Sequence, residues 1–252
     1  MAGTPLTLVV ITKNEEAVIE KCLKSAFWVD HVVVVDSGST DKTIEIAKAC
    51  GATVVHQDWL GFGPQKQFGV EQAPTDWVLS LDADEFLSPE LSIALREVMQ
   101  KGPKAPAYRF ARTNKFLGQF LYHGEGYPDW SLRLFDRTKA RWSADAVHEK
   151  VQAIDGKLTV KTVKGDLMHE SGESISRYIE KQNRYTDLQA QALIQSGKKI
   201  GALNALFSPL VRFVRFYFLK AGFLDGFAGF VHISIGCFFA GLKYVKALAM
   251  KS

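Results

Sequence analysis

The chain has 252 residues, of which 47% are hydrophobic and 23% charged, a composition that is ordinary for a folded protein and excludes intrinsic disorder. At this length we expect one large domain with an appended segment. The three cysteines are far apart and form no CxxC pair, which argues against a disulfide framework and a structural zinc site. No signal peptide is predicted at the N-terminus, so we expect a reducing, cytoplasmic setting.

The net charge of +4 is unevenly distributed along the chain. From residue 198 onward there are eight Lys or Arg and one acidic residue, Asp225, so the tail carries +7 and residues 1–197 carry −3. This asymmetry predicts an anionic partner for the tail. An ordinary basic helical surface is the alternative.

The first half alternates short apolar runs with segments of helical spacing. Strands are predicted at residues 6–11, 31–36, 52–56 and 77–81, because these runs are rich in β-branched residues, as in strands buried on both faces. Helices are predicted at residues 15–26, 41–50, 61–72 and 88–100. The alternation indicates βαβ units, and therefore an α/β fold with a mostly parallel sheet flanked by helices.

Polar segments follow three of the predicted strands: Thr12–Glu15, Asp36–Asp41 and Asp82–Glu85. In such sheets ligands bind at the carboxyl ends of the strands. Neither GxGxxG nor GxxxxGK[ST] occurs at these ends, which excludes a dinucleotide fingerprint and a P-loop. A carboxylate such as Asp36 can accept hydrogen bonds from a base or a ribose. Helix capping is the alternative for the polar residues that precede a helix.

Asp82 and Asp84 form the strongest local pattern. On an extended segment these two residues point the same way, so both carboxylates can address one cation. Mg²⁺ is held in proteins by one or two carboxylates together with substrate phosphates. The alternative places Asp84 and Glu85 in the first turn of the following helix. Because the pair follows a buried strand, we favour the metal site and assign Glu85 to capping or a structural ion pair.

The runs VVITKNEE, VVVVDSGSTDKT and GFGPQKQFGVEQAPTDWVLSLDADE resemble the family 2, GT-A-fold nucleotide-sugar glycosyltransferases. Within that family they are most similar to the lipopolysaccharide-core β-1,4-glucosyltransferases, which add glucose to an inner-core heptose. The resemblance covers most of residues 5–170. It implies inverting transfer from a UDP-sugar that depends on Mg²⁺ or Mn²⁺.

The resemblance also implies roles for individual residues. It places four residues around the uridine: Thr12, Asn14, Glu15 and Asp36. It assigns Asp82 and Asp84 to the metal and diphosphate. Lys66 suits a phosphate charge, with a solvated helix lysine as the alternative.

Inverting transfer needs a general base that takes the proton of the acceptor hydroxyl. Many family members carry a Glu-Asp pair where this chain has His148-Glu149, and we predict Glu149 as the base. Asp129 is the first alternative and Asp145 the second. Glu149 could instead form a surface ion pair with a basic neighbour.

Three further side chains have two possible roles. His169 could be a ligand of the metal, as in related folds, or a structural histidine. Arg133 alternates with apolar residues and could meet phosphate or pair with an acid. The rings of Tyr127 and Trp130 could stack on sugars or pack in the core.

The tail is predicted to be helical and to lie on a membrane. Residues 226–242 run for 17 positions without a Lys, Arg, Asp or Glu, which falls short of the ~20 residues needed to cross a bilayer. Apolar helices at 202–219 and 226–242 with basic and tyrosine residues fit helices at an anionic membrane surface. A true span and a soluble helical cap are the alternatives, and the apolar content argues against a nucleic-acid partner.

The sequence therefore predicts a GT-A domain over residues 1–197 and a membrane-associating tail over 198–252. Residues 1–115 form the nucleotide-sugar half of the domain and 116–197 the acceptor half. The expected enzyme transfers a hexose, glucose from UDP-glucose, to a lipid-linked glycan at the cytoplasmic face of the bacterial inner membrane. The alternatives are a polyprenyl-phosphate or capsule and exopolysaccharide glycosyltransferase, and a non-catalytic nucleotide-sugar-binding protein.

Overall fold

The computed structural model describes residues 3–145, 149–172, 174–197 and 199–251. The chain divides into two compact units. The sheet unit consists of Met1–Arg112 and Asp129–Glu170, and the helical unit of Thr113–Pro128 and Ser171–Ser252. This division differs from the boundary expected at residue 197, because the helix that follows Ser174 packs against the C-terminal helix.

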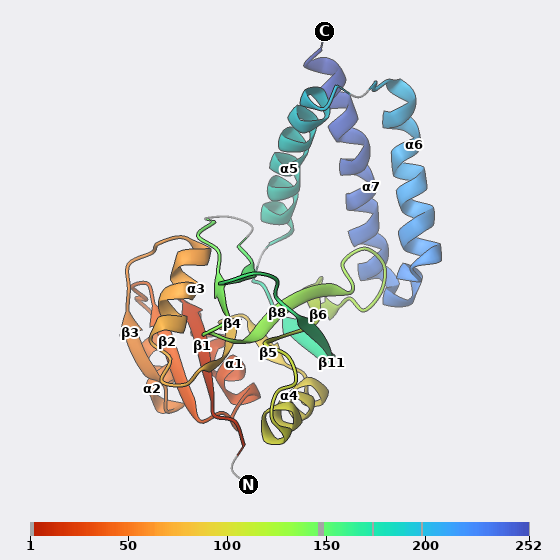
Figure 1. Ribbon diagram of the computed structural model, residues 1–252. Helices are drawn as coiled ribbons and strands as arrows, with labels where there is room; N and C mark the ends of the chain where they lie inside the picture. Colours follow the sequence, from red (N-terminus) through yellow and green to blue (C-terminus); the bar gives the residue numbers. More distant parts are fainter. Residues whose placement is uncertain (1–2, 146–148, 173, 198, 252) are drawn as a thin grey trace. The chain divides into compact units, whose positions relative to one another are not determined.

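The sheet unit is built on four parallel strands in the order β3-β2-β1-β4 (Figure 1). Their bounds are β1 (Leu6–Thr12), β2 (His31–Asp36), β3 (Thr53–His56) and β4 (Trp77–Asp82). Antiparallel partners extend the sheet beyond β4: β8 (Asp129–Asp136), β6 (Ala107–Phe116), β11 (Val160–His169) and β5 (Glu85–Leu87). Strand β7 (Gln119–Phe120) pairs with β6, while β9 (Ala140–Trp142) and β10 (Val151–Ala153) form a separate pair.

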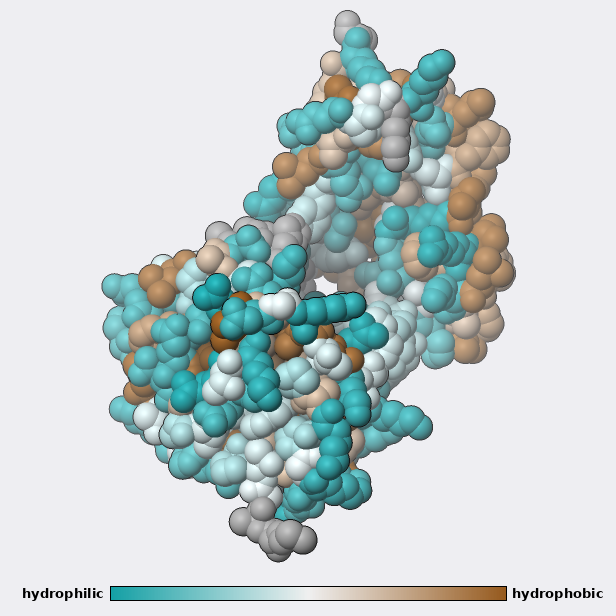
Figure 2. All heavy atoms as spheres, in the orientation of Figure 1, coloured by the Kyte–Doolittle hydropathy of each residue, from teal (hydrophilic) through white to brown (hydrophobic). Residues whose placement is uncertain are grey.

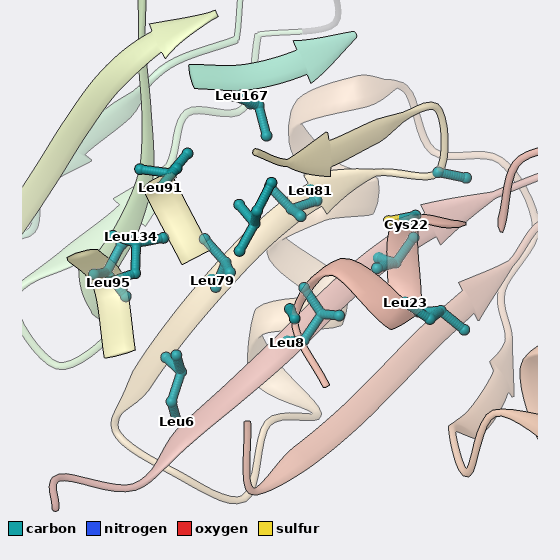
Figure 3. Packing of buried hydrophobic residues seen from close by; sticks show 14 of the residues in the cluster. Leu6, Leu8, Cys22, Leu23, Leu79, Leu81, Leu91, Leu95, Leu134 and Leu167 are labelled. Atoms are coloured by element: carbon teal, nitrogen blue, oxygen red, sulfur yellow. The ribbon is translucent and has the colours of Figure 1, made fainter. Parts of the chain in front are cut away.

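Helices flank both faces of this sheet, which confirms the α/β fold class. They are α1 (Ile19–Ser25), α2 (Thr43–Ala49), α3 (Phe62–Glu71) and α4 (Pro89–Lys101). All seven residues of β1 are buried, as expected for a strand covered on both sides. Leu8 and Val10 belong to the cluster that includes residues of α1, α2 and α4 (Figure 3), whereas Val9 packs with Val70 of α3.

Helix α1 begins later than the predicted residue 15. The backbone N–H of Glu15 donates to the hydroxyl of Thr43 at 2.8 Å, and that of Glu16 donates to Asp41 at 3.2 Å. Asn14 adopts a φ of 57°, outside the right-handed helical region. The first polar strand end is therefore an ordered loop bound to the second one.

The helical unit contains α5 (Ile175–Gln195), α6 (Ala202–Phe213), a π-helical turn η1 (Val214–Leu219), a 3₁₀ turn η2 (Gly222–Asp225) and α7 (Gly226–Ala249). A Cβ at Gly241 of α7 would lie 3.0 Å from the Pro209 ring and 3.1 Å from the Ala205 carbonyl, so a glycine permits the close packing of α6 and α7. Two segments, Ala202–Leu219 and Gly222–Ala249, are long and apolar enough to cross a membrane by length and composition.

Candidate active site

The carboxyl ends of β1 and β2 lie side by side, since Thr12 is paired in register with Asp36. One oxygen of the Asp36 carboxylate accepts the N–H groups of Gly38 at 2.9 Å and Ser39 at 3.0 Å. This local turn explains the small residues that follow Asp36. The hydroxyl of Thr12 takes no part in the turn. The Thr12 Oγ1 is buried and has no hydrogen-bond partner among the residues described.

Asn14 and Glu15 complete the first strand end. The amide oxygen of Asn14 accepts the N–H of Thr40 at 2.8 Å, which ties the two loops together. Burial raises the pKa of Glu15, and the negative charges of Asp84 and Asp41 raise it further. Carboxylates from three strand ends therefore repel one another at this edge, as a cation site requires. The four predicted uridine residues are brought together at the same edge.

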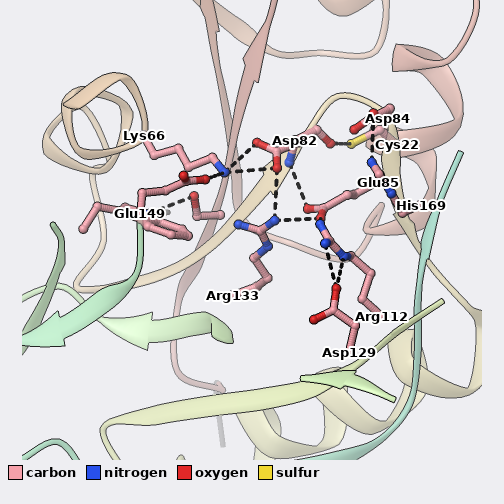
Figure 4. A network of polar contacts seen from close by, with 12 residues as sticks. Cys22, Lys66, Asp82, Asp84, Glu85, Arg112, Asp129, Arg133, Glu149 and His169 are labelled. Atoms are coloured by element: carbon pink, nitrogen blue, oxygen red, sulfur yellow. Dashed lines mark hydrogen bonds and ion pairs between the residues drawn. The ribbon is translucent and has the colours of Figure 1, made fainter. Parts of the chain in front are cut away.

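Lys66 of α3 lies between two acidic side chains (Figure 4). Its Nζ is 3.0 and 3.1 Å from the two carboxylate oxygens of Asp82 and 2.8 Å from Oε1 of Glu149. The residue is only 1% exposed, so it is not the solvated helix lysine of the alternative interpretation. Glu149 likewise pairs with a buried ammonium group instead of a surface neighbour.

Arg133 of β8 joins Asp82 to a second, fully buried carboxylate, Glu85. Its Nη2 donates to Oδ2 of Asp82 at 3.0 Å and to Oε1 of Glu85 at 2.7 Å. Glu85 also accepts the backbone N–H of Asp82 at 3.1 Å. The ion pair expected for Glu85 is thus present, and it fixes the backbone at the first residue of the Asp82-x-Asp84 pattern.

Arg112 was not identified from the sequence, and it extends this network. Its Nη1 donates to Glu85 at 3.2 Å, while Nε and Nη2 donate to one oxygen of Asp129 at 2.9 and 2.7 Å. Arg112 lies two residues after the buried Phe110 in β6, which places it on the same face of the strand but indicates no partner.

The charges of the network set the ionisation of its members. Burial alone would raise the pKa of Asp82, but Arg133 and Lys66 outweigh it and lower the pKa to about 2. Burial disfavours the charged form of Arg133, yet the Glu85 and Asp82 carboxylates raise its pKa above the usual value. Asp82 is therefore an anion, and Arg133 a cation, at neutral pH.

Asp84 and His169 form a separate pair on the other side of Asp82. Nε2 of His169 lies 3.1 Å from Oδ2 of Asp84, and about a quarter of each side chain is exposed. The structure therefore places the predicted histidine ligand beside the second predicted carboxylate ligand.

The donor set of this edge fits a hard divalent cation. Two buried oxygens of this site, Thr12 Oγ1 and Asp82 Oδ1, have no hydrogen-bond partner within the described ranges, although Asp82 Oδ1 lies 3.0 Å from the Lys66 ammonium. Arg133 Nε also has no such partner there, but it is a donor and suits a phosphate oxygen, not a cation. Those ranges contain no group of three or more His, Cys, Asp or Glu side chains that could enclose a metal. Two carboxylates thus suit Mg²⁺ or Mn²⁺ completed by substrate phosphate, not an all-protein cage.

The loop that carries Glu149 packs tightly against the start of α3. A Cβ at Gly63 would lie 2.2 Å from the carbonyl oxygen of Ser143 and 2.7 Å from that of Asp145, so only glycine fits. His148, the other half of the predicted pair, lies outside the described residues. Asp129, the alternative base, is held by Arg112 through two hydrogen bonds to one oxygen.

The two candidate sugar-stacking rings have different surroundings. Trp130 is 48% exposed and lies 5.1 Å from the Arg109 guanidinium, so the core-packing interpretation is wrong for it. Tyr127 belongs to the helical unit, where its ring packs edge-on against Tyr122 at 6.0 Å.

The α/β fold and the charged strand ends agree with the glycosyltransferase class that the sequence motifs resemble. The sequence model of Glycosyl transferase family 2 matches residues 7–157, and the chain belongs to this family. A lipopolysaccharide core biosynthesis glycosyltransferase, LpsC of Rhizobium meliloti, is 31% identical over 249 residues, which cover 96% of this chain and 91% of LpsC. An uncharacterized glycosyltransferase of Rickettsia typhi is 32% identical over 254 residues, covering 96% and 87% of the two chains.

Two solved structures are also similar. Glucosyl-3-phosphoglycerate synthase from Mycobacterium tuberculosis, in complex with Mn²⁺, UDP and phosphoglyceric acid, is 28% identical over 43% of each chain, with a TM-score of 0.37. Staphylococcus aureus TarS is 13% identical, covers 96% of this chain and 92% of its own, and has a TM-score of 0.49.

Proposed function

We propose that this family 2 glycosyltransferase transfers a hexose from a UDP-sugar to a lipid-linked glycan, with inversion at the anomeric carbon. Glucose is the proposed sugar, and an inner-core heptose of lipopolysaccharide is the proposed acceptor. The similarity to LpsC, a lipopolysaccharide core biosynthesis enzyme, supports this acceptor class. The observation that carries the proposal is the buried Lys66, which joins Asp82 at a strand end to Glu149.

The donor would bind along the strand ends. The uridine is assigned to the edge formed by Thr12, Asn14, Glu15 and Asp36, and the Thr12 hydroxyl offers it an unused hydrogen-bonding group. Asp82 and Asp84 would hold Mg²⁺ or Mn²⁺, with His169 as a further ligand. When bound, the cation neutralises charge on the departing diphosphate.

Glu149 is assigned as the general base. It accepts the proton of the acceptor hydroxyl while the hydroxyl oxygen attacks the anomeric carbon. The bond from that carbon to the diphosphate breaks, and its electron pair leaves with UDP. Lys66 and Arg133 provide fixed positive charge beside the leaving group, and such preorganised charge stabilises the transition state. Asp129, which Arg112 holds through one oxygen, is the alternative base.

The helical unit is assigned to an anionic membrane surface. Its apolar segments carry basic residues, and their apolar content favours lipid over nucleic acid. A peripheral position at the cytoplasmic face of the inner membrane would let a soluble nucleotide sugar meet a lipid-bound acceptor.

A donor and acceptor screen with the purified full-length protein tests this function. UDP-glucose, UDP-galactose, UDP-N-acetylglucosamine and GDP-mannose are each combined with Mn²⁺ and lipopolysaccharides truncated at successive inner-core residues. We expect transfer from UDP-glucose to acceptors that end in an exposed heptose, with a β-linkage by NMR. Polyprenyl phosphate is included as a further acceptor, and transfer to it in place of lipopolysaccharide would support the alternative acceptor. Absence of transfer to every acceptor would overturn the proposal.

A further inference from the structure

An apolar stripe runs along α6 and η1 of the helical unit. Seven of its large side chains are 50% or more exposed: Leu203, Leu206, Phe207, Leu210, Val211, Val214 and Phe218. Their spacing of three and four residues places them on one side of the helix. Within the described stretch Ala202–Leu219 no residue is buried. Figure 2 shows brown, apolar residues along the outer side of α6.

The charges around this stripe indicate what covers it. Residues 199–224 contain four basic residues and no acidic one, and Arg215 and Lys220 are exposed. A second copy of the chain on this face would bring like charges together. An anionic bilayer offers both hydrocarbon for the stripe and negative headgroups for the lysine and arginine.

The far end of α7 is held by a polar helix. Nζ of Lys246 donates to the side-chain oxygen of Asn183 at 2.8 Å and to the hydroxyl of Thr186 at 2.8 Å, and it lies 2.6 Å from the Asp187 carboxylate. All three partners belong to α5, a helix that also carries the charged residues Arg177, Glu180, Lys181 and Arg184. Helix α7 is therefore covered there by a helix suited to water, not to lipid.

The middle of α7 meets a polar loop of the same unit. Arg212 donates to Glu125 through Nε at 3.0 Å and makes a second ionic contact through Nη2. A Cβ at Gly236 would lie 2.6 Å from a Glu125 oxygen, so glycine makes room for this ion pair against α7. One turn earlier, the His232 ring packs on Tyr178 of α5, with ring centroids 5.8 Å apart.

The start of α7 is fixed to the same loop. The buried Asp225 carboxylate accepts the N–H groups of Tyr122 at 3.2 Å and His123 at 2.8 Å, and it lies 2.8 Å from the His123 ring. Helix α7 is thus joined to polar elements at its start, its middle and its end. A helix surrounded by lipid must satisfy its polar partners internally, and ionisable groups in hydrocarbon are costly.

We propose that the helical unit is a monotopic anchor: the α6–η1 stripe enters one leaflet of an anionic bilayer, and α7 stays at the interface as its support. Neither Ala202–Leu219 nor Gly222–Ala249 then crosses the membrane, although both segments are long and apolar enough by length and composition. The inference deepens the membrane association within the proposed function. The anchor uses no residue of the candidate active site. An experiment can therefore contradict the anchor without contradicting the proposed transfer reaction, and the reverse.

Vesicle flotation with the full-length protein tests whether the α6–η1 stripe enters the bilayer. The vesicles contain phosphatidylcholine with or without phosphatidylglycerol. The double variant Leu206→Gln/Val214→Gln is compared with Ile93→Gln, which replaces an equally exposed apolar side chain of α4. We expect the double variant to lose about tenfold or more of its binding to anionic vesicles, since two exposed apolar side chains that would enter the bilayer are replaced by polar ones. Ile93→Gln should bind like the wild type, and UDP binding should be unchanged in all three proteins.

An environment-sensitive fluorophore tests the topology. It is attached by a genetically encoded residue at Val211 of α6 or at Leu188 of α5, both of which are exposed. On vesicle binding, emission from position 211 should shift to the blue and that from position 188 should not. A shift at both positions would indicate that α5 and α7 enter the bilayer and would overturn the monotopic arrangement. Two results would overturn the insertion of the α6–η1 stripe into the bilayer. One is unchanged vesicle binding of the double variant; the other is a wild-type dimer that the double substitution converts to a monomer.

Discussion

The Nζ of Lys66 donates to Oε1 of Glu149 at 2.8 Å while lying about equally close to both oxygens of Asp82. The ammonium group is buried, and its nitrogen also lies 4.9 Å from the centre of the Trp142 ring. One buried cation therefore connects the proposed base to the proposed diphosphate site. Removing one partner of a buried ion pair leaves an uncompensated charge, so this contact affects both stability and chemistry.

Replacing Lys66 by Met should weaken donor binding and slow transfer. Asp82 would keep its ion pair with Arg133 but lose the one with Lys66, and Glu149 would lose its pairing with the Lys66 ammonium. We expect UDP affinity in the presence of Mn²⁺ to fall about tenfold, and the free energy of unfolding to fall by about 1–3 kcal/mol. Calorimetry and urea unfolding measure these changes. Lys164→Met removes an exposed lysine and is the control; equal UDP affinity in both variants would contradict the assignment of Lys66.

Replacing Glu149 by Gln should abolish transfer and spare donor binding. The amide keeps the size of the side chain but cannot take the proton, so kcat should fall by about 10²–10⁴. Asp129→Asn is the matched comparison, and there we expect less than a tenfold loss of kcat. Full activity of Glu149→Gln together with an inactive Asp129→Asn would move the base to Asp129.

Gly63→Ala should disturb the position of Glu149 while leaving its carboxylate chemically unchanged, since a Cβ at residue 63 would also lie 3.3 Å from the Glu149 Cβ. The added Cβ would lie 2.2 Å from the carbonyl of Ser143, so the loop or the first turn of α3 must shift. Overpacking of this kind costs about 1–3 kcal/mol of stability, and kcat should fall more than donor affinity. Gly172→Ala is the control, because a Cβ there meets nothing within 4 Å. A wild-type kcat for Gly63→Ala would show that the loop position is not critical.

Local patterns were sufficient to predict the parallel strands and their polar ends. The run of β-branched residues in β1 is buried on both faces, and Thr12 and Asp36 meet at one edge as expected. These features depend on the alternation of strand and helix and on the rule for ligand sites in parallel sheets. Both are properties of short sequence windows.

Pairing across long sequence distances was not predictable. Lys66 and Glu149 are 83 positions apart, and no local feature of α3 indicates that its lysine is buried. The predicted start of α1 at residue 15 was wrong, because the side chains of Thr43 and Asp41 accept the N–H groups of Glu15 and Glu16. In each case a tertiary partner overrides what the local sequence favours.

Acid should remove a part of the stability that depends on Asp82. Its pKa is lowered to about 2 in the folded protein, so its contribution is complete above the unfolded pKa of ~3.9 and is lost as pH falls toward 2. For this shift the contribution is at most about 2–3 kcal/mol. Urea unfolding of the metal-free protein between pH 2 and 6 measures it. The Asp82→Asn variant should be less stable than the wild type at pH 6, and its free energy of unfolding should change less between pH 2 and 6. An equal dependence on pH in the two proteins would contradict the low pKa of Asp82.

Replacing Asp84 by Asn should weaken metal binding more than replacing His169 by Gln. A carboxylate supplies a charged oxygen ligand to Mg²⁺ or Mn²⁺, whereas a neutral amide oxygen supplies none of that charge. We expect Mn²⁺ affinity in the presence of UDP to fall at least tenfold for Asp84→Asn and by less for His169→Gln, as measured by the EPR signal of free Mn²⁺. UDP binding without metal should change little in either variant, because neither side chain belongs to the uridine edge. Unaltered Mn²⁺ affinity and turnover in Asp84→Asn would exclude Asp84 as a ligand, and a larger loss in His169→Gln would make the histidine the principal protein donor.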